Sequence, residues 1–164
     1  MSSTTTTGVR RTAPGADHSV CYAGHLFTFL VTSEETHGRC AVVEETVQRG
    51  TSLDLPLRIH NRETVCAYVI DGEVIVEMDG EARSLAAGSC VAIPSGIPHR
   101  FVLTSESARL INVYAPGGFD GFFRDLGEPA ASVPRARVTT TPLDIEQLVS
   151  VAARYSVEIV AAAA

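Results

Sequence analysis

The sequence predicts an all-β fold, a barrel or two-sheet sandwich, followed by short C-terminal helices. From about Leu26 to Ala115 the chain is a series of short segments that are rich in β-forming residues and partly alternate apolar with polar positions. Two Asp-Gly pairs, at 71–72 and 79–80, predict tight hairpins. Many short strands separated by Gly and Pro are typical of closed or double-sheet β folds. The expected strands are LFTFLV, CAVVEETV, VCAYVI, EVIVEM, CVAI, HRFVL and RLINVY.

After Pro116 the pattern becomes helical. A first short helix is predicted because apolar residues fall at i, i+3, i+4 and i+7, namely Phe119, Phe122, Phe123 and Leu126. A second helix is predicted to begin with Thr141 as its cap and Pro142 at its first position. Its expected apolar stripe is Ile145, Leu148, Val149 and Ala152. We expect both helices to pack against the barrel or a partner subunit, and a lid over the barrel mouth is the alternative for the first.

Length and composition indicate one ordinary globular domain. The chain has 164 residues, and we expect a disordered polar tail over 1–17, a β-barrel over 18–115 and a helical extension over 116–164. A formal charge of -6 argues against a nucleic-acid partner, and no apolar run is long enough to cross a membrane. Four cysteines without a C-x-x-C pair, and an N-terminus without a hydrophobic signal core, indicate a reduced, cytoplasmic protein.

Two stretches with a histidine stand out, PLRIHNRETVCAYVIDG from residue 56 and GSCVAIPSGIPHRFVL from residue 88. They resemble the two motifs of the cupin superfamily. The second motif is G-x5-P-x-G-x2-H-x3-N, and its first four positions are matched by Gly88, Pro94, Gly96 and His99. The chain departs from the motif at the last position, where Leu103 replaces Asn. In the first motif, H-x-H-x3,4-E-x6-G, His60 takes the second histidine position and Gly72 the closing glycine.

With its C-terminal segments, the chain looks like a small bacterial cupin similar to quercetin dioxygenase. The resemblance implies a jelly-roll barrel, a homodimer and a mononuclear metal, held by two histidines and a glutamate from the first motif and one histidine from the second. Such a ligand set suits iron, manganese, nickel or copper. Here Arg58 replaces the first histidine and Val65 the glutamate, so His60 and His99 are the surviving ligands.

The replacement by Arg58 argues against a resident metal. Residues two apart in a strand share a face, so Arg58 and His60 should point into the same cavity. A guanidinium ~4 Å from an ion would repel each unit of its charge by about 4 kcal/mol at an effective dielectric near 20. A carboxylate from Glu63, or from whichever of Glu44 and Glu45 faces inward, could still complete a metal site. We nevertheless favour a site without a metal.

Without an ion, Arg58, His60 and His99 form a minimal set for acid/base catalysis. Arg58 offers a planar fork for a carboxylate, enolate or phenolate, and its field keeps at least one imidazole neutral and able to accept a proton. A histidine base beside an anion-stabilising arginine supports cyclisation, isomerisation or dehydration of a carbonyl or phenolic substrate. By analogy with the family, that substrate is a polyketide-like small molecule of bacterial specialised metabolism. The predicted substrate-binding residues are Val65, Ala67, Phe101, Leu103, Asn112 and Tyr114.

Two other functions stay open from the sequence. One is a metal-dependent dioxygenase of the quercetin dioxygenase type, with Fe, Mn, Ni or Cu bound through His60 and His99. The other is a non-catalytic cupin that binds a small molecule. Arg58 could also form a buried ion pair with Glu44, Glu45 or Glu63, which would plug the site. We expect surface or loop positions for the other histidines, His18, His25 and His37, and no catalytic role for Cys66, Tyr68 and Cys90.

Overall fold

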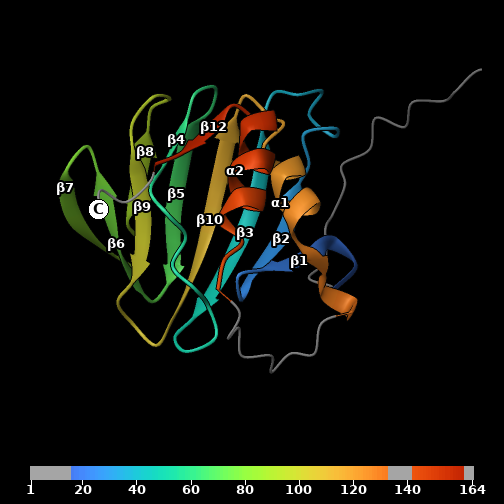
Figure 1. Cartoon of the computed structure of the whole chain (residues 1–164). Coiled ribbons are helices and arrows are strands. Elements are labelled where there is room, and N and C mark those ends of the chain that lie inside the picture. The colour runs from blue at the N-terminus through green and yellow to red at the C-terminus, as the bar shows by residue number, and fades with distance from the viewer. Residues whose placement is uncertain (1–15, 133–141, 161–164) are drawn as a thin grey trace, which may run out of the picture.

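The computed structural model describes residues 16–132 and 142–160 and consists of two antiparallel sheets that face one another (Figure 1). Across the larger sheet the strands are β11 (Glu128–Pro129), β1 (Ser19–Tyr22), β2 (His25–Val31), β3 (Ala41–Gln48), β10 (Ser107–Ala115), β5 (Thr64–Asp71) and β8 (Cys90–Ile93). Across the smaller sheet they are β12 (Val157–Ile159), β4 (Arg58–His60), β9 (His99–Leu103), β6 (Glu73–Met78) and β7 (Glu81–Ala86). The predicted all-β fold is confirmed.

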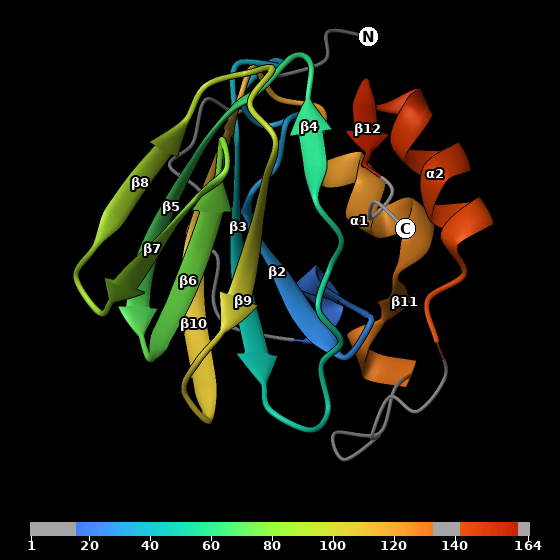
Figure 2. The same ribbon diagram turned by 60° about the vertical axis from the view of Figure 1, so that its left-hand side comes forward.

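Two short helices complete the barrel, α1 (Asp120–Leu126) and α2 (Ile145–Arg154). Figure 2 shows the smaller sheet over one part of the larger sheet, whereas α1 and α2 lie beside the part that carries β1 and β2. The chain after residue 115 also adds strands, because β11 pairs with β1 and β12 pairs with β4. Single turns of 3₁₀-helix occur at Ala16–His18 and Ala130–Ser132. Of the predicted disordered tail, residues 1–15 lie outside the described residues.

The core forms from alternate residues of the strands, as the period of two requires. Phe27 and Phe29 on β2, Val43 on β3, Val65 on β5 and Val76 on β6 are all buried in one apolar cluster. The same cluster contains residues of both helices, so α1 and α2 belong to the core that closes this end of the barrel. None of the helices in the described ranges is long and apolar enough to cross a bilayer.

One of the two Asp-Gly turns differs from the predicted hairpin. The turn at 79–80 joins the paired strands β6 and β7, as expected. The turn at 71–72 instead carries the chain from β5 in the larger sheet to β6 in the smaller one. Gly72 has a φ of +79°, and a Cβ there would lie 2.1 Å from the Ser107 carbonyl oxygen, so the crossing requires glycine.

The helices follow the sequence pattern with two corrections at α2. In α1, Phe122 and Phe123 are buried as predicted, and the backbone N–H of Gly127 donates to the Phe123 carbonyl oxygen. In α2 the cap is Asp144, whose carboxylate accepts from the backbone N–H of Gln147, while Thr141 lies outside the described residues. The buried stripe is Leu148, Val151 and Ala152, whereas Ile145 and Val149 are about half exposed. The helix therefore presents to α1 a face rotated from the predicted one.

Candidate functional site

The two motif histidines lie side by side inside the barrel, on β4 and β9. Their ring centroids are 5.5 Å apart with 20° between the ring planes, and both side chains are buried, with His60 2% and His99 1% exposed. Arg58 is the cross-strand neighbour of His99 and precedes His60 by two residues on the same strand. Residues so related share one face of a sheet. The structure thus brings together the three residues that the sequence singled out.

On each imidazole ring one nitrogen is hydrogen-bonded and the other has no hydrogen-bond partner. Nδ1 of His99 is 2.9 Å from the Ile97 carbonyl oxygen, which can only accept, so Nδ1 carries the hydrogen. Nδ1 of His60 is 3.3 Å from the Glu63 carboxylate, which fixes the same tautomer. The two Nε2 atoms are buried and have no hydrogen-bond partner. In the neutral rings these atoms carry free lone pairs, which can accept a proton or bind a ligand.

The environment keeps both rings neutral. Burial, followed by the charge of Arg58 and that of His60, lowers the pKa of His99 to about 3. Burial and the charge of Arg58 also lower the pKa of His60, although the hydrogen bond and charge of Glu63 oppose the change. The sequence argument that a guanidinium beside the histidines favours neutral imidazoles therefore agrees with the arrangement of these groups.

Arg58 has no ionic partner among the described residues. Its contact is a hydrogen bond of 3.5 Å from Nη1 to the Pro56 carbonyl oxygen, at the outer limit of such bonds. The three candidate acidic partners are engaged elsewhere: Glu44 with Arg109, Glu45 with His25, and Glu63 with His60 and Arg62. The buried ion pair considered from the sequence is therefore not formed, and the guanidinium is available to a bound anion.

A second polar cluster, which the sequence analysis missed, faces Arg58 from the larger sheet. His25 was expected at the surface, but it is 6% exposed on β2 and its Nδ1 lies 2.7 Å from the Glu45 carboxylate on β3. Its Nε2 lies 2.6 Å from the Leu53 carbonyl oxygen, and Asn112 donates to the other oxygen of Glu45 at 2.9 Å. The alternation of β2 could have predicted this burial, because His25 lies on the same face of the strand as the buried Phe27 and Phe29.

His25 and Glu45 form an ion pair within this cluster. Burial alone lowers the pKa of His25, but the hydrogen bond and charge of Glu45 outweigh burial and raise it. Burial alone raises the pKa of Glu45, but the hydrogen bond and charge of His25, with the charge of Arg58, lower it. A protonated ring also explains why both nitrogens of His25 face acceptors. The negative charge of Glu45 is thus balanced by His25.

Two cavities meet at Arg58, Glu45 and Leu55, which line both of them. The first cavity has aliphatic walls and includes Phe101 and Leu103, two of the predicted substrate-binding residues. The second lies against α1 and α2 and includes the predicted Tyr114. Asn112 holds Glu45 in place. Val65 and Ala67 are buried in the hydrophobic clusters, because their strand packs against the barrel interior.

The donor set does not fit the metal that the fold family implies. Glu63 is fully buried, so the loop before β5 does bring a carboxylate inward, but it contacts Nδ1 of His60, on the side of the ring away from Nε2. Glu63 thus orients the ring and does not share an ion with Nε2. Among the described residues, no three His, Cys, Asp or Glu side chains are grouped to hold an ion, and Arg58 stands at the missing histidine.

Two facing antiparallel sheets with a histidine from each of two neighbouring strands between them define a jelly-roll barrel of the cupin class. A family model described as a cupin domain matches residues 43–114. This match, together with the two histidine motifs, supports membership of the cupin superfamily.

Known proteins are similar over parts of the chain. Quercetin 2,3-dioxygenase of Bacillus subtilis is 27% identical over 104 residues, which are 63% of this chain and 30% of the enzyme. The HTH-type transcriptional regulator PuuR of Escherichia coli is 33% identical over 91 residues, 55% of this chain and 48% of the regulator. The chain thus spans about half or less of these relatives.

Solved structures share the fold at low identity. An RmlC-like cupin from Shewanella frigidimarina superposes with a TM-score of 0.59 at 20% identity, covering 70% of this chain and 96% of that chain. The nucleoside dehydratase Pac13 superposes with a TM-score of 0.55 at 17% identity, covering 70% and 88%.

Proposed function

We propose that the protein is a small-molecule enzyme that performs acid/base chemistry without a metal. The reaction is a cyclisation, isomerisation or dehydration, and the substrate is a carbonyl or phenolic, polyketide-like compound of the kind made in bacterial specialised metabolism. One observation carries the proposal: two neutral imidazoles, each with a bare buried Nε2, lie beside a guanidinium that has no ionic partner among the described residues. Base and anion stabiliser are thus adjacent, and both imidazole rings are buried.

His60 is the better placed base of the two. When its Nε2 takes a proton from the carbon next to a carbonyl, the ring becomes an imidazolium whose Nδ1–H still donates to Glu63. Nδ1 of His99 instead contacts the Ile97 carbonyl oxygen, which carries no full charge. An imidazolium at His99 is therefore stabilised less than one at His60. The electron pair of the broken C–H bond moves onto the carbonyl oxygen, and Arg58 stabilises the resulting enolate. Return of the proton to another carbon gives isomerisation, and its transfer to a departing hydroxyl gives dehydration.

A metal-dependent dioxygenase is the second candidate. The two unpartnered Nε2 atoms favour it, since a metal ion is an alternative occupant of such lone pairs, and so does the similarity to quercetin 2,3-dioxygenase. A non-catalytic binding cupin is the third, with PuuR as a relative that carries a similar segment in a regulator. Acid/base catalysis predicts proton exchange in the absence of metal, whereas neither of these two candidates does.

The test follows exchange at a carbon next to a carbonyl. Phenylpyruvate is incubated in D₂O with chelator-treated protein, and loss of its benzylic ¹H signal is followed by NMR. We expect catalysed exchange that falls about a hundredfold or more in His60→Gln, since general base catalysis contributes about 10²–10⁴. His37→Asn is the matched control, because His37 is exposed. Exchange in His60→Gln and in His60→Gln/His99→Gln that is as fast as in the unaltered protein would contradict the proposal.

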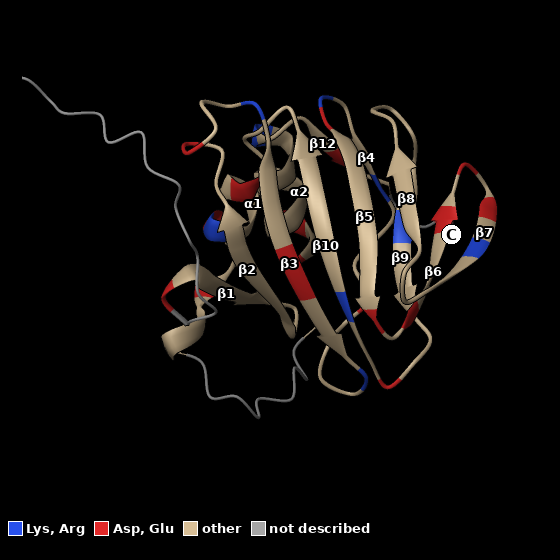
Figure 3. Cartoon of the chain, turned by 180° about the vertical axis from the view of Figure 1, so that it is seen from behind, with Lys and Arg blue, Asp and Glu red and all other residues tan. Residues whose placement is uncertain are grey.

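The protein is further proposed to be a homodimer. The outer face of β5 and β10 carries no charged residue in its middle, as Figure 3 shows, and Tyr68 there is 45% exposed. Neighbouring outward positions are Cys66, Ile111 and Val113. In a chain with a net charge of -6, this uncharged face is where two copies approach with least repulsion.

A further inference from the structure

The second cavity is walled by aromatic rings. It lies between the inner face of the larger sheet and the two helices, and its aromatic lining residues are Tyr22, Phe27, Tyr114, Phe119, Phe122 and Phe123. The rings are packed against each other, with centroids 4.2 Å apart for Phe27 and Phe123 and 4.8 Å for Tyr114 and Phe119. Flat walls of this kind favour a flat ligand.

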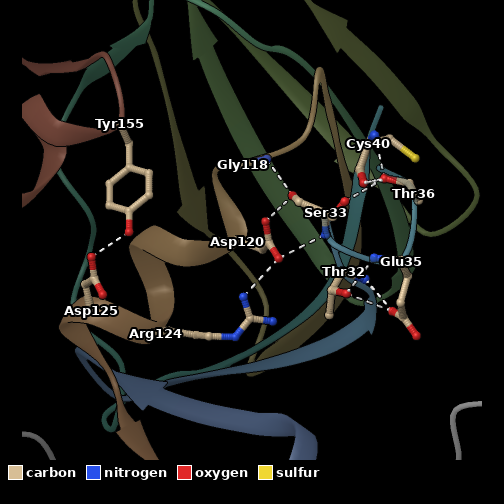
Figure 4. Close-up of polar contacts among 10 residues, drawn as sticks. All are labelled: Thr32, Ser33, Glu35, Thr36, Cys40, Gly118, Asp120, Arg124, Asp125 and Tyr155. Atoms are coloured by element: carbon tan, nitrogen blue, oxygen red, sulfur yellow. Dashed lines mark hydrogen bonds and ion pairs between the residues drawn. The ribbon is translucent and has the colours of Figure 1, made fainter. Parts of the chain in front are cut away.

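Polar contacts at the start and the end of α1 hold this helix in place (Figure 4). Asp120, at the start of α1, accepts hydrogen bonds from the backbone N–H and hydroxyl of Ser33 and from Arg124. At the end of the helix, the Tyr155 hydroxyl donates to Asp125. The phenylalanines of α1 are therefore positioned before any ligand arrives. The alternative that α1 moves as a lid stays a prediction.

The charges at the inner end of the cavity leave one positive charge uncompensated. Glu45 and Arg58 both line the cavity, but Glu45 is paired with His25, and its second oxygen accepts from Asn112. Arg58 has no acidic partner among the described residues. Of the two charged residues that line this cavity, Arg58 is therefore the one whose charge has no ionic partner among the described residues. A monoanion neutralises that charge, whereas a cation is repelled and a polyphosphate exceeds it.

We propose that the second cavity holds the aromatic ring of a monoanionic ligand whose carboxylate or phenolate oxygens bind Arg58. The inference rests on the proposed function, because it names the substrate class of the same site. The ring of His60 contacts Phe119, with centroids 4.4 Å apart, and its centroid is 5.9 Å from that of Tyr114. His60 is not among the residues that line the cavity, but its ring packs against Phe119, which is.

Binding of three single-ring probes tests the inference, with dissociation constants measured by saturation-transfer NMR. Benzoate carries a flat ring and a charge, benzamide the ring without the charge, and cyclohexanecarboxylate the charge without a flat ring. We expect benzoate to bind about tenfold to a hundredfold more tightly than benzamide, as a charge-assisted bidentate contact predicts. We expect it to bind more tightly than cyclohexanecarboxylate as well, because the walls are aromatic.

Variants assign the two preferences to the two parts of the site. In Arg58→Gln the preference for benzoate over benzamide should vanish, whereas Arg109→Gln, which removes a charge from an outward position of β10, should keep it. In Tyr22→Leu the preference for benzoate over cyclohexanecarboxylate should shrink, and Tyr22 is only partly buried, so this change spares the core. Equal binding of benzoate and benzamide, retention of the preference in Arg58→Gln, or no binding of any probe would overturn the inference.

The outcome is separable from that of the proposed function. The His60→Gln/His99→Gln variant leaves Arg58 and the aromatic walls intact, so it should still bind benzoate while losing proton exchange on phenylpyruvate. Binding without exchange in the unaltered protein would uphold the ligand class and refute the enzyme. If exchange requires His60 but benzoate binding does not depend on Arg58, the enzyme is upheld and the ligand class is refuted.

Discussion

Arg58 and His99 are cross-strand partners on β4 and β9, where the family pattern would place two metal-binding histidines opposite each other. A guanidinium in this position changes the site in two ways. It removes a ligand, and it puts a permanent positive charge beside rings that stay neutral. The chemistry proposed for this protein follows from that pair.

The protonation state of His99 gives the first prediction. Its pKa is lowered to about 3, so the ring should remain neutral in ¹H–¹⁵N NMR spectra at pH 5, with the hydrogen on Nδ1. Because the folded state holds the neutral ring, its contribution to stability is complete above the ordinary pKa of 6.5 and is lost as the pH falls below that value. In Arg58→Gln the pKa of His99 should rise, since one of the groups that lower it is gone. A protonated His99 at pH 5 in the unaltered protein would contradict the arrangement.

The His25–Glu45 pair predicts a pH window of stability. The pKa of His25 is raised, so its contribution is complete below the usual 6.5 and is lost as the pH rises through the raised value. The pKa of Glu45 is lowered, so its contribution is complete above the usual 4.5 and is lost as the pH falls through the lowered value. The pair therefore stabilises the fold most between pH 4.5 and 6.5.

A double-mutant cycle of His25→Gln and Glu45→Gln measures this coupling from denaturant unfolding. Each single variant should lose about 3–5 kcal/mol of unfolding free energy near pH 6, because it leaves a buried charge without its partner. The coupling between them should shrink as the pH rises through the raised pKa of His25. A coupling that is constant from pH 5 to pH 9 would show that the two groups do not form an ion pair.

The contact between Ser33 and Asp120 predicts the stability of the helical end. Asp120 is 2% exposed and accepts three hydrogen bonds, two of them from Ser33. Ser33→Ala should lower the unfolding free energy by about 1–3 kcal/mol, since a buried carboxylate loses a donor. Ser132→Ala is the control, because Ser132 is exposed and bonds the Pro129 carbonyl oxygen. A loss no larger than that of the control would mean that the helix is held by its phenylalanines alone.

The uncharged outer face predicts the oligomeric state. Native mass spectrometry of the full chain should show a dimer, and Tyr68→Lys should shift it to a monomer because it places a charge in the middle of the apolar face. Glu81→Lys, at the exposed end of β7, changes the charge of the chain elsewhere and should leave the dimer intact. A dimer that survives Tyr68→Lys would place the interface on another face.

Motif spacing and strand periodicity predicted the centre of the site. The spacing from Gly88 to His99 located one histidine, and the period of two placed Arg58 beside His60 and turned one of Glu44 and Glu45 inward. These features depend on residues near each other in the chain or on a regular strand, so a single sequence contains them.

Other features depend on tertiary contacts that no local pattern records. Glu63 enters the core because the loop after His60 folds back, and it lies two positions before Val65, which stands at the glutamate position of the family motif. The aromatic cavity exists because α1 packs against β2 while α2 packs against α1 and β12. The rotation of α2 about its own axis, shown by the exposed Ile145 and Val149, is set by that packing. His25 was missed because a lone histidine in a strand is more often exposed than buried.

The metal content of the untreated protein tests the central claim most directly. The protein is purified without added metal or chelator, and iron, manganese, nickel and copper are measured per chain by mass spectrometry. A guanidinium opposite His99 with two neutral imidazoles predicts far less than one ion per chain, with the His60→Gln/His99→Gln variant no different. One ion per chain that disappears in that variant would contradict the account, because Nε2 of each ring would then be a ligand and not a base.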